Sequence, residues 1–331
     1  MDYQYVFYWN PEDYYRIAFG DIINKDYVYY VTNAVENNSI ITRSIHSLAF
    51  SDRVNKRIKI PLKEKWNSLY IKSLGSLDKQ LPTQFVFHGS YYWMKSSDYF
   101  SFLKQIYPSN RIVMLLMDTI ESYKKYFAEK YYGSFDVSYI KQTFDRVLTY
   151  NLFDSEKYGL EYYPSIYSKY EFDFTDECNT DVFFIGKSKN RIDQIHQAYE
   201  NLTESGLKCD FYVTEVDETQ KKYADIHYNQ RLCYLDVLKK VVASKGLLEI
   251  VQEGSNGFTF RLDEALVYDK NIITNNPIID TLEYRNNPKV FRFTRTPDID
   301  ANRYRDVAGL TFDYKGEYSP NQLIQYLEKT S

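Results

Sequence analysis

The sequence predicts an α/β fold in which parallel sheets carry helices on their faces. Short apolar runs alternate with longer amphipathic segments along the chain, as in strand–helix–strand units. This alternation stops at an acidic, aperiodic stretch, 167–180, and then starts again. A length of 331 residues also suits two domains, at about 150 residues per domain. We therefore expect two α/β domains, 1–166 and 181–318, joined by a linker at 167–180.

In the first domain, apolar runs of strand length alternate with polar segments. Residues 97–108 have helical spacing and stop at Pro108, and the run before them ends in a glycine turn. Strands are expected at 3–9, 26–33, 83–93 and 110–118, and at the end of 139–151.

The second domain repeats this order. Two amphipathic helices, 190–206 and 228–246, are each expected to end at a glycine. A last helix, 319–331, opens with Ser319 as its N-cap and Pro320 as its first helical residue. Strands are expected at 180–189, 208–216, 247–252 and 271–276.

Composition and charge exclude several classes of protein. The net charge of −4 argues against a nucleic-acid partner, because such proteins carry a basic excess. Cys178, Cys209 and Cys233 form neither a disulfide framework nor a zinc pattern, which fits a reducing compartment. The N-terminus does not read as a signal peptide, and the chain has no apolar run of about 18 residues. We therefore expect a cytoplasmic protein.

Aromatic residues are abundant, with 35 tyrosines and 21 phenylalanines. Tyrosine buries a ring and leaves its hydroxyl in water, which suits half-buried positions and surfaces that face carbohydrate. The alternative is that an AT-rich genome enriches tyrosine without a functional reason.

The stretch "FFIGKSKNR" has the chemistry of a diphosphate site. Gly186 permits close approach of the backbone at the end of a strand, and Lys187, Lys189 and Arg191 follow it. These cations precede a helix, whose free N–H groups and dipole favour an anion. With one glycine, the pattern matches neither a dinucleotide fingerprint nor a P-loop. The alternative is a solvated basic helix entrance.

A second candidate region, 247–276, contains a glycine turn after an apolar run. Gly254 and Gly257 allow the turn to approach a ligand at the carboxyl end of a strand, where open α/β sheets bind ligands. Ser255 or Thr259 is expected to cap the next helix and to donate to a phosphate.

Within that helix, Arg261 has the geometry to pair bidentately with phosphate oxygens, and Glu264 to accept hydrogen bonds from a ribose diol. The alternative is a surface ion pair three residues apart, which stabilises a helix by a few tenths of a kcal/mol.

Residues 181–213 and 234–276 resemble the carboxyl-terminal half of bacterial glycosyltransferases of the GT-B fold, of the kind encoded in capsule and surface-polysaccharide clusters. Residues 85–93, 102–118 and 144–164 resemble the first half of the same group. The resemblance implies two Rossmann-like domains that face a cleft. It also implies that the second domain holds a nucleotide-sugar donor and the first takes the acceptor.

By position, the resemblance implies a donor site in which Glu264 binds the ribose. Glu253 and Glu264 are eleven positions apart, whereas many retaining members have two glutamates eight apart, so the stereochemistry stays open. Asp298 and Asp300 follow Pro297 in a polar loop and are interpreted as turn residues, so no metal is expected. The implied donor-binding residues are Gly186, Lys187, Lys189, Arg191, Gly254, Gly257, Thr259, Arg261, Glu264 and Asn275.

Transfer to a hydroxyl needs help with its proton or compensation for charge on the leaving diphosphate. His88, after a strand of the first domain, is the first candidate for a base or a sugar contact, and Asp118 is the second. A histidine satisfied by the backbone is the alternative for His88. His46 and His227 are expected to be peripheral, and His196 structural.

Six cations interleave with apolar residues in "RVNKRIKIPLKEKW", 53–66. An anionic lipid surface attracts such a segment by about 1 kcal/mol per cation, so contact with the inner membrane surface is one interpretation and an exposed charged strand is the other. The predicted activity is metal-independent transfer of a sugar from a nucleotide-diphosphate donor to a glycan or lipid-linked acceptor. The alternatives are a nucleotide-sugar epimerase and a non-catalytic binding module.

Overall fold

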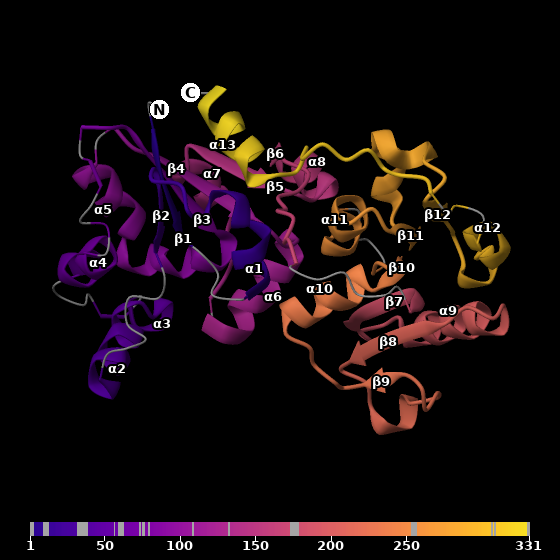
Figure 1. The fold of residues 1–331 in the computed structure, drawn as a ribbon. Helices are drawn as coiled ribbons and strands as arrows, with labels where there is room; N and C mark the ends of the chain where they lie inside the picture. Colours follow the sequence, from indigo (N-terminus) through magenta and orange to yellow (C-terminus); the bar gives the residue numbers. More distant parts are fainter. Residues whose placement is uncertain are drawn as a thin grey trace. The chain divides into compact units, whose positions relative to one another are not determined.

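The chain folds into two compact units (Figure 1). Unit 1 contains Met1–Arg16, Asp21–Pro164 and Ile324–Ser331, and unit 2 contains Ile17–Gly20 and Ser165–Leu323. The end of the chain thus belongs to the first unit. The computed structural model describes residues 3–8, 13–31, 39–55, 57–58, 63–72, 74, 77–78, 80–107, 109–131, 133–172, 179–252, 257–305, 307 and 309–329.

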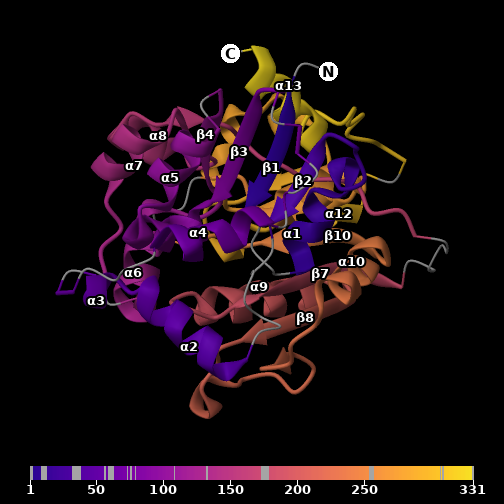
Figure 2. The same cartoon turned by 90° about the vertical axis from the view of Figure 1, so that its left-hand side faces the viewer.

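Unit 1 is built on a six-stranded parallel sheet in the order β2-β1-β3-β4-β5-β6. Figure 2 shows the first four of these strands side by side. The strand order reverses at β1, so β1 and β3 flank the switch point of the sheet. The strands are β1 (Gln4–Tyr8), β2 (Val28–Val31), β3 (Thr83–His88), β4 (Arg111–Leu116), β5 (Arg146–Thr149) and β6 (Glu161–Tyr162).

The helices of unit 1 begin and end where local chemistry allows. The Asn151 side chain caps α8 by accepting from the Asp154 N–H at 2.9 Å, and Gly159, with φ 61°, ends it. The helices are α1 (Asp13–Ala18), α2 (Ile40–Ala49), α3 (Asp52–Asn55), α4 (Lys63–Lys72), α5 (Tyr99–Ile106), α6 (Ile120–Tyr131), α7 (Val137–Thr143) and α8 (Leu152–Tyr158), with 3₁₀ helices η1 (Gly20–Ile22) and η2 (Gly89–Ser97).

Two expectations for unit 1 are wrong. The segment after β3 is not a glycine turn but the 3₁₀ helix η2, because the His88 ring caps it by accepting from the Ser90 N–H. The basic segment 53–66 is not an exposed strand either, since its described residues lie in α3, in α4 and in the turn after α3. Trp66 is partly buried and packs against the core of unit 1.

Unit 2 has a second six-stranded parallel sheet, in the order β9-β8-β7-β10-β11-β12. Numbered within the unit, this is 3-2-1-4-5-6, the strand order of a Rossmann fold. The prediction of two parallel α/β units is therefore confirmed, and the switch point of unit 2 lies between β7 and β10. The strands are β7 (Thr180–Lys187), β8 (Cys209–Thr214), β9 (His227–Tyr228), β10 (Ser244–Glu249), β11 (Asn271–Thr274) and β12 (Val290–Arg292).

Helices connect these strands, and two further helices, α12 and α13, follow the last strand. Gly206, with φ 75°, follows α9 as expected. Gly246, however, lies inside β10 and ends no helix; a Cβ there would sit 2.5 Å from the Tyr304 hydroxyl oxygen. The helices are α9 (Ile192–Glu204), α10 (Tyr234–Val242), α11 (Phe260–Val267), α12 (Ala301–Arg305) and α13 (Pro320–Lys329), with 3₁₀ helices η3 (Glu218–Gln220), η4 (Pro277–Thr281), η5 (Glu283–Asn286) and η6 (Thr296–Asp298).

The last turns of α13 pack on unit 1, beside strands from the start of the chain (Figures 1 and 2). Gln84 on β3 donates to the Leu327 carbonyl at 3.2 Å, and the Tyr5 hydroxyl donates to Glu328 at 3.2 Å. Tyr326 donates to Glu161 on β6. Unit 1 is therefore completed by residues more than 150 positions beyond its last strand.

Candidate active site

Arg191 lies across the switch point of the second sheet. Its Nε and Nη2 donate to the Lys187 carbonyl, at the end of β7, at 3.3 and 3.2 Å. Its Nη1 donates to the Ile250 carbonyl, one residue beyond β10. Burial lowers the pKa of the guanidinium and the nearby Glu249 raises it, but an arginine keeps its charge at neutral pH. A fixed positive charge thus stands at the carboxyl ends of the two central strands.

Gly186 makes room for that arginine. A Cβ at Gly186 would lie 3.1 Å from Arg191 Nη2 and 3.2 Å from Phe184 Cζ. The glycine lies within β7 rather than in the turn after it. It thus serves the close approach of a side chain.

The turn that leads into α9 is exposed and basic. Lys187 forms an ion pair with Glu215 at 2.6 Å, and Lys189, exposed with φ 45°, follows it. Among the described residues, α9 has no side-chain cap, since its N-cap residue Arg191 makes no capping hydrogen bond. The first N–H groups of a 13-residue helix therefore face this turn together with its cations.

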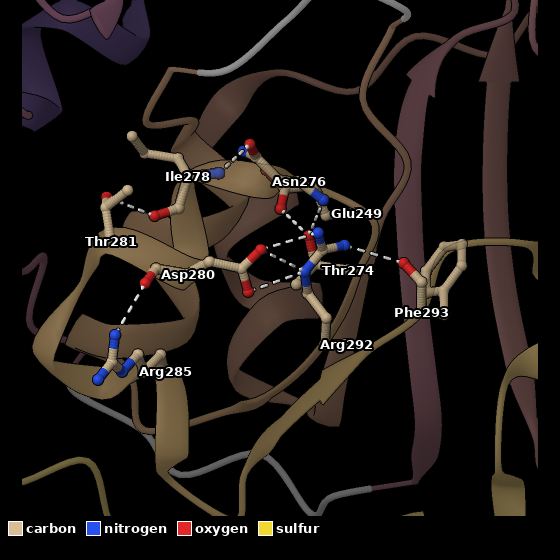
Figure 3. Close-up of polar contacts among 9 residues, drawn as sticks. All are labelled: Glu249, Thr274, Asn276, Ile278, Asp280, Thr281, Arg285, Arg292 and Phe293. Carbon is tan, nitrogen blue, oxygen red and sulfur yellow. Dashed lines mark hydrogen bonds and ion pairs between the residues drawn. The ribbon is translucent and has the colours of Figure 1, made fainter.

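Near Arg191 lies a buried carboxylate, Glu249, that the sequence analysis did not select. Figure 3 shows it beside Thr274 and Asn276. Glu249, 3% exposed, accepts from the hydroxyls of Thr259 and Thr274 and from the Asn276 amide nitrogen at 3.2 Å. Asn276 also donates to the Gly257 carbonyl at 3.0 Å. The network ties the ends of β10 and β11 to the start of α11. An acid inside the apolar run "LLEIV" was the signal for it.

Arg292, which the sequence analysis also did not select, lies at the same edge of the sheet, where β12 ends (Figure 3). Arg292 forms an ion pair with Asp280 at 2.9 Å and donates to the Phe293 carbonyl at 3.0 Å. Arg285 donates to the Asp280 carbonyl at 3.4 Å. These contacts fix η4 against the end of β12.

Arg261 and Glu264 lie inside unit 2 rather than on a helix surface. Glu264 is fully buried, and its carboxylate pairs with the Arg261 guanidinium at 2.5 Å. It also accepts from the Tyr234 hydroxyl at 2.7 Å, and Tyr234 in turn contacts the Tyr167 hydroxyl at 2.6 Å. Burial raises the pKa of Glu264 to about 7, against the opposing effects of Arg261 and Tyr234. The alternative of a surface ion pair is therefore wrong, and the ribose role stays a prediction.

The other predicted donor residues support the same edge. Thr259 caps α11, as expected, by accepting from the Leu262 N–H at 3.3 Å. Its hydroxyl proton goes to Glu249, and a hydroxyl has one proton to donate. Asn275 accepts from the Val251 N–H at 2.8 Å. Gly254 and Ser255 lie outside the described residues.

Unit 1 contains a cavity of about 450 Å³ at the switch point of its sheet. Its wall is largely aromatic, with polar groups between the rings. Both catalytic candidates, His88 at the end of β3 and Asp118 after β4, line it. The lining residues are Tyr14, Tyr15, Tyr70, His88, Ser90, Tyr91, Trp93, Asp118, Ser122, Tyr123, Tyr126, Lys130 and Tyr131.

Both ring nitrogens of His88 have partners. Nδ1 accepts from the Ser90 N–H at 3.1 Å, so the proton of the neutral ring lies on Nε2, which is 2.9 Å from the Tyr15 hydroxyl. Burial lowers the pKa of His88 to about 3. The ring is thus a neutral, oriented group at neutral pH. Asp118 is exposed, and its Oδ1 accepts from the Thr119 N–H at 2.7 Å.

The remaining histidines differ in their surroundings. His46 was expected to be peripheral, yet its Nε2 lies 2.6 Å from the hydroxyl of Tyr70, which lines the cavity. His196 contacts the Tyr228 hydroxyl at 2.7 Å, consistent with a structural role. His227 lies 3.4 Å from Asp210 in unit 2.

Among the residues that the structure describes, no helix combines the length and apolarity that crossing a membrane requires. The same residues contain no group of three or more histidines, cysteines or acids placed to hold a metal ion. Asp298 pairs with Arg295 at 3.0 Å, and Asp300 accepts from the Asn302 N–H at 3.1 Å, so their interpretation as turn residues is confirmed.

No protein-family model and no curated protein matches the sequence. Similar solved structures include the glycotransferase of kitacinnamycin, with 8% identity, 99% of this chain and 98% of that chain covered, and a TM-score of 0.44. A DNA-modifying β-glucosyltransferase has 10% identity, 93% and 89% coverage and a TM-score of 0.44. Phytolacca americana UGT2 has 10% identity, 98% and 93% coverage and a TM-score of 0.41. Because each TM-score is below 0.5, these likenesses decide nothing about this chain.

Proposed function

We propose that this protein is a glycosyltransferase of GT-B architecture that transfers a sugar from a nucleotide-diphosphate donor to a glycan or lipid-linked acceptor in surface polysaccharide biosynthesis. The observation that carries the proposal is the position of Arg191. It is a half-buried cation at the switch point of a Rossmann-ordered sheet, next to the uncapped start of α9. This is the place where such sheets bind ligands, and the local charge suits an anion.

The donor diphosphate lies, in this proposal, between the first N–H groups of α9 and the cations Arg191, Lys187 and Lys189. These groups stabilise the negative charge that grows on the diphosphate as the sugar leaves. No metal is needed for that step, because fixed cations and helix N–H groups provide the compensation. Gly186 acts by leaving space for Arg191.

The other donor residues act mainly by holding the edge of the sheet. Thr259 and Asn275 fix the start of α11 and the exit of β10. Arg261 and Glu264 fix α11 from inside, so a contact between Glu264 and the ribose requires their ion pair to open. Gly257 belongs, in this proposal, to the backbone that approaches the nucleotide, whereas Gly254 lies outside the described residues.

The acceptor binds, in this proposal, in the aromatic cavity of unit 1. Tyrosine and tryptophan rings bind the apolar face of a sugar ring and leave polar edges for its hydroxyls. Asp118, exposed in the cavity wall, accepts the proton of the acceptor hydroxyl. His88, neutral and held by Ser90 and Tyr15, orients the sugar by hydrogen bonding.

The test is a thermal-shift panel with UDP, GDP, CDP and dTDP. A ligand at about 100 times its dissociation constant stabilises the protein by about 2.7 kcal/mol. We expect one of the four to raise the Tm of the wild type and of Arg295→Gln, whose guanidinium is 77% exposed and paired with Asp298. Arg191→Gln should lose most of that increase. A panel in which no nucleotide moves the wild-type Tm contradicts the donor site.

Turnover separates this proposal from its alternatives. A transferase consumes the nucleotide sugar when an acceptor glycan is present and releases the nucleoside diphosphate. An epimerase converts the soluble nucleotide sugar without an acceptor. A binding module shows the thermal shift with no turnover in either assay.

A further inference from the structure

Helix α2 of unit 1 carries an apolar face that is exposed to solvent. Ile40, Ile41, Ile45 and Leu48 have 73, 72, 46 and 53% of their surface exposed. At 100° per residue these four positions and Ser44 occupy one continuous side of the helix. Isolated exposed apolar residues are ordinary, but four bulky aliphatic side chains on one side of one helix mark an interaction surface.

The opposite side of α2 is fixed to unit 1, so the helix presents its apolar face in a defined way. Ala49 and, just beyond the helix, Phe50 are buried in the core. His46 Nε2 lies 2.6 Å from the Tyr70 hydroxyl. Asn55 at the end of α3 donates to the Ala49 carbonyl at 2.8 Å, which joins the two helices.

The elements next to α2 are basic. Arg53 on α3, Arg57 in the turn after it and Lys65 on α4 are exposed, and so is Ile58, at 64%. In the sequence, 39–66 contains seven lysines and arginines and two acidic residues, a net charge of +5, whereas the whole chain carries −4. In a protein that is acidic as a whole, the segment that contains this exposed apolar helix therefore has a net positive charge.

We propose that α2, α3 and the start of α4 form a docking surface for an anionic lipid bilayer. The aliphatic face of α2 enters the boundary between headgroups and acyl chains, while Arg53, Arg57 and Lys65 contact acidic headgroups. A short amphipathic helix needs both contributions, since neither a few aliphatic side chains nor a few cations bind a membrane stably alone.

The charge around α2 distinguishes an anionic bilayer from a second copy of the chain as the partner of this surface. In a two-fold dimer the same patch faces itself, so the cations around α2 would meet each other. An anionic surface pairs with them instead. The observations therefore favour a lipid surface.

The experiment is co-sedimentation of the full chain with vesicles of phosphatidylcholine alone or mixed with phosphatidylglycerol, at low and high salt. We expect binding to the anionic vesicles only, and weaker binding at high salt. The double variants Ile41→Glu/Ile45→Glu and Arg53→Glu/Arg57→Glu should each lower the bound fraction about tenfold or more. All four changed side chains are exposed, so the melting temperature should stay within the range of surface substitutions.

The control is Phe153→Glu on α8, which is 50% exposed and well separated from α2 within unit 1 (Figures 1 and 2). It should bind vesicles like the wild type. Wild-type protein that stays in solution with anionic vesicles overturns the proposal. So does a concentration-dependent dimer that Ile41→Glu/Ile45→Glu dissociates without any change in vesicle binding. The assay contains neither donor nor acceptor, so its outcome is independent of the proposed enzyme activity.

Discussion

Glu264 is a buried acid whose effect on stability depends on pH. Burial raises its pKa in the folded protein to about 7, while an unfolded glutamate titrates near pH 4.5. Between these values the folded state binds the extra proton, so stability from this group is complete below about pH 4.5 and is lost as the pH rises to 7. The loss amounts to about 1.4 kcal/mol for each pH unit.

Glu264→Gln removes this titration. We expect its free energy of unfolding, measured by urea denaturation, to increase relative to that of the wild type as the pH rises from 5 to 7. The comparison of the two proteins isolates Glu264 from the neighbouring Asp263, whose pKa burial also raises. A difference that stays constant over this range contradicts the prediction.

His88 gives the opposite kind of prediction, because its charge does not change near neutral pH. Its lowered pKa, about 3, keeps the ring neutral in the assay range, and the stability from this group is lost only as the pH falls from 6.5 toward 3. His88→Gln should lower sugar transfer but leave the shape of the pH profile unchanged between pH 5.5 and 8. If the rate of sugar transfer by the wild type changes with pH near 6.5 and the variant lacks this change, His88 is the base instead.

At the scale of the element, α11 depends on one hydroxyl at its start. Thr259 accepts from the Leu262 N–H and donates to the buried Glu249, so it caps the helix and satisfies a carboxylate with the same group. Thr259→Val keeps the shape and removes both contacts, and we expect a loss of about 2 kcal/mol in the free energy of unfolding. Thr259→Ser keeps the hydroxyl and should lose less than half as much in the same denaturation assay.

The elements also show what a sequence can reveal. The strands at 3–9, 110–118 and 271–276 and the helix at 190–206 follow from apolar spacing and an end residue, which are local signals. The prediction that a helix ends at Gly246 was wrong because glycine also occurs in strands where neighbouring atoms leave no room for a Cβ. The atoms that crowd Gly246 belong to Tyr304 and Asn271, which lie in distant segments of the sequence. The His88 cap of η2 was equally invisible, because it depends on the side-chain orientation of one residue.

The candidate site follows the same rule. Gly186, Lys187 and Arg191 were selected because they are contiguous at a strand end, and the structure places Arg191 at the switch point. The sequence analysis did not select Glu249, Thr274 and Asn276, because their hydrogen-bond network joins the ends of two separate strands. The ion pair of Arg261 with Glu264 was the alternative that their spacing offered, as a surface pair. Its burial depends on Tyr234 and Tyr167, which the linear sequence does not place beside it.

At the scale of the molecule, unit 1 depends on both ends of the chain. A fragment of residues 1–166 contains all six strands of the first sheet but lacks α13, whose Ile324 and Leu327 belong to unit 1 and are buried. Gln84, Glu161 and Tyr5 then lose hydrogen-bond partners. We expect this fragment to melt well below the full chain by calorimetry, and addition of a peptide spanning 318–331 to raise its Tm. A fragment as stable as the full chain contradicts this.

The return of α13 to the first sheet also sets an order of events during synthesis. The ribosome makes the strands of unit 1 first, yet the helix that completes their packing is made only after the strands of unit 2. Until α13 has been made, Tyr5 and Gln84 lack their partners on it. Nascent unit 1 therefore exposes an unfinished face throughout the production of unit 2, and a truncated message yields a protein with that face open.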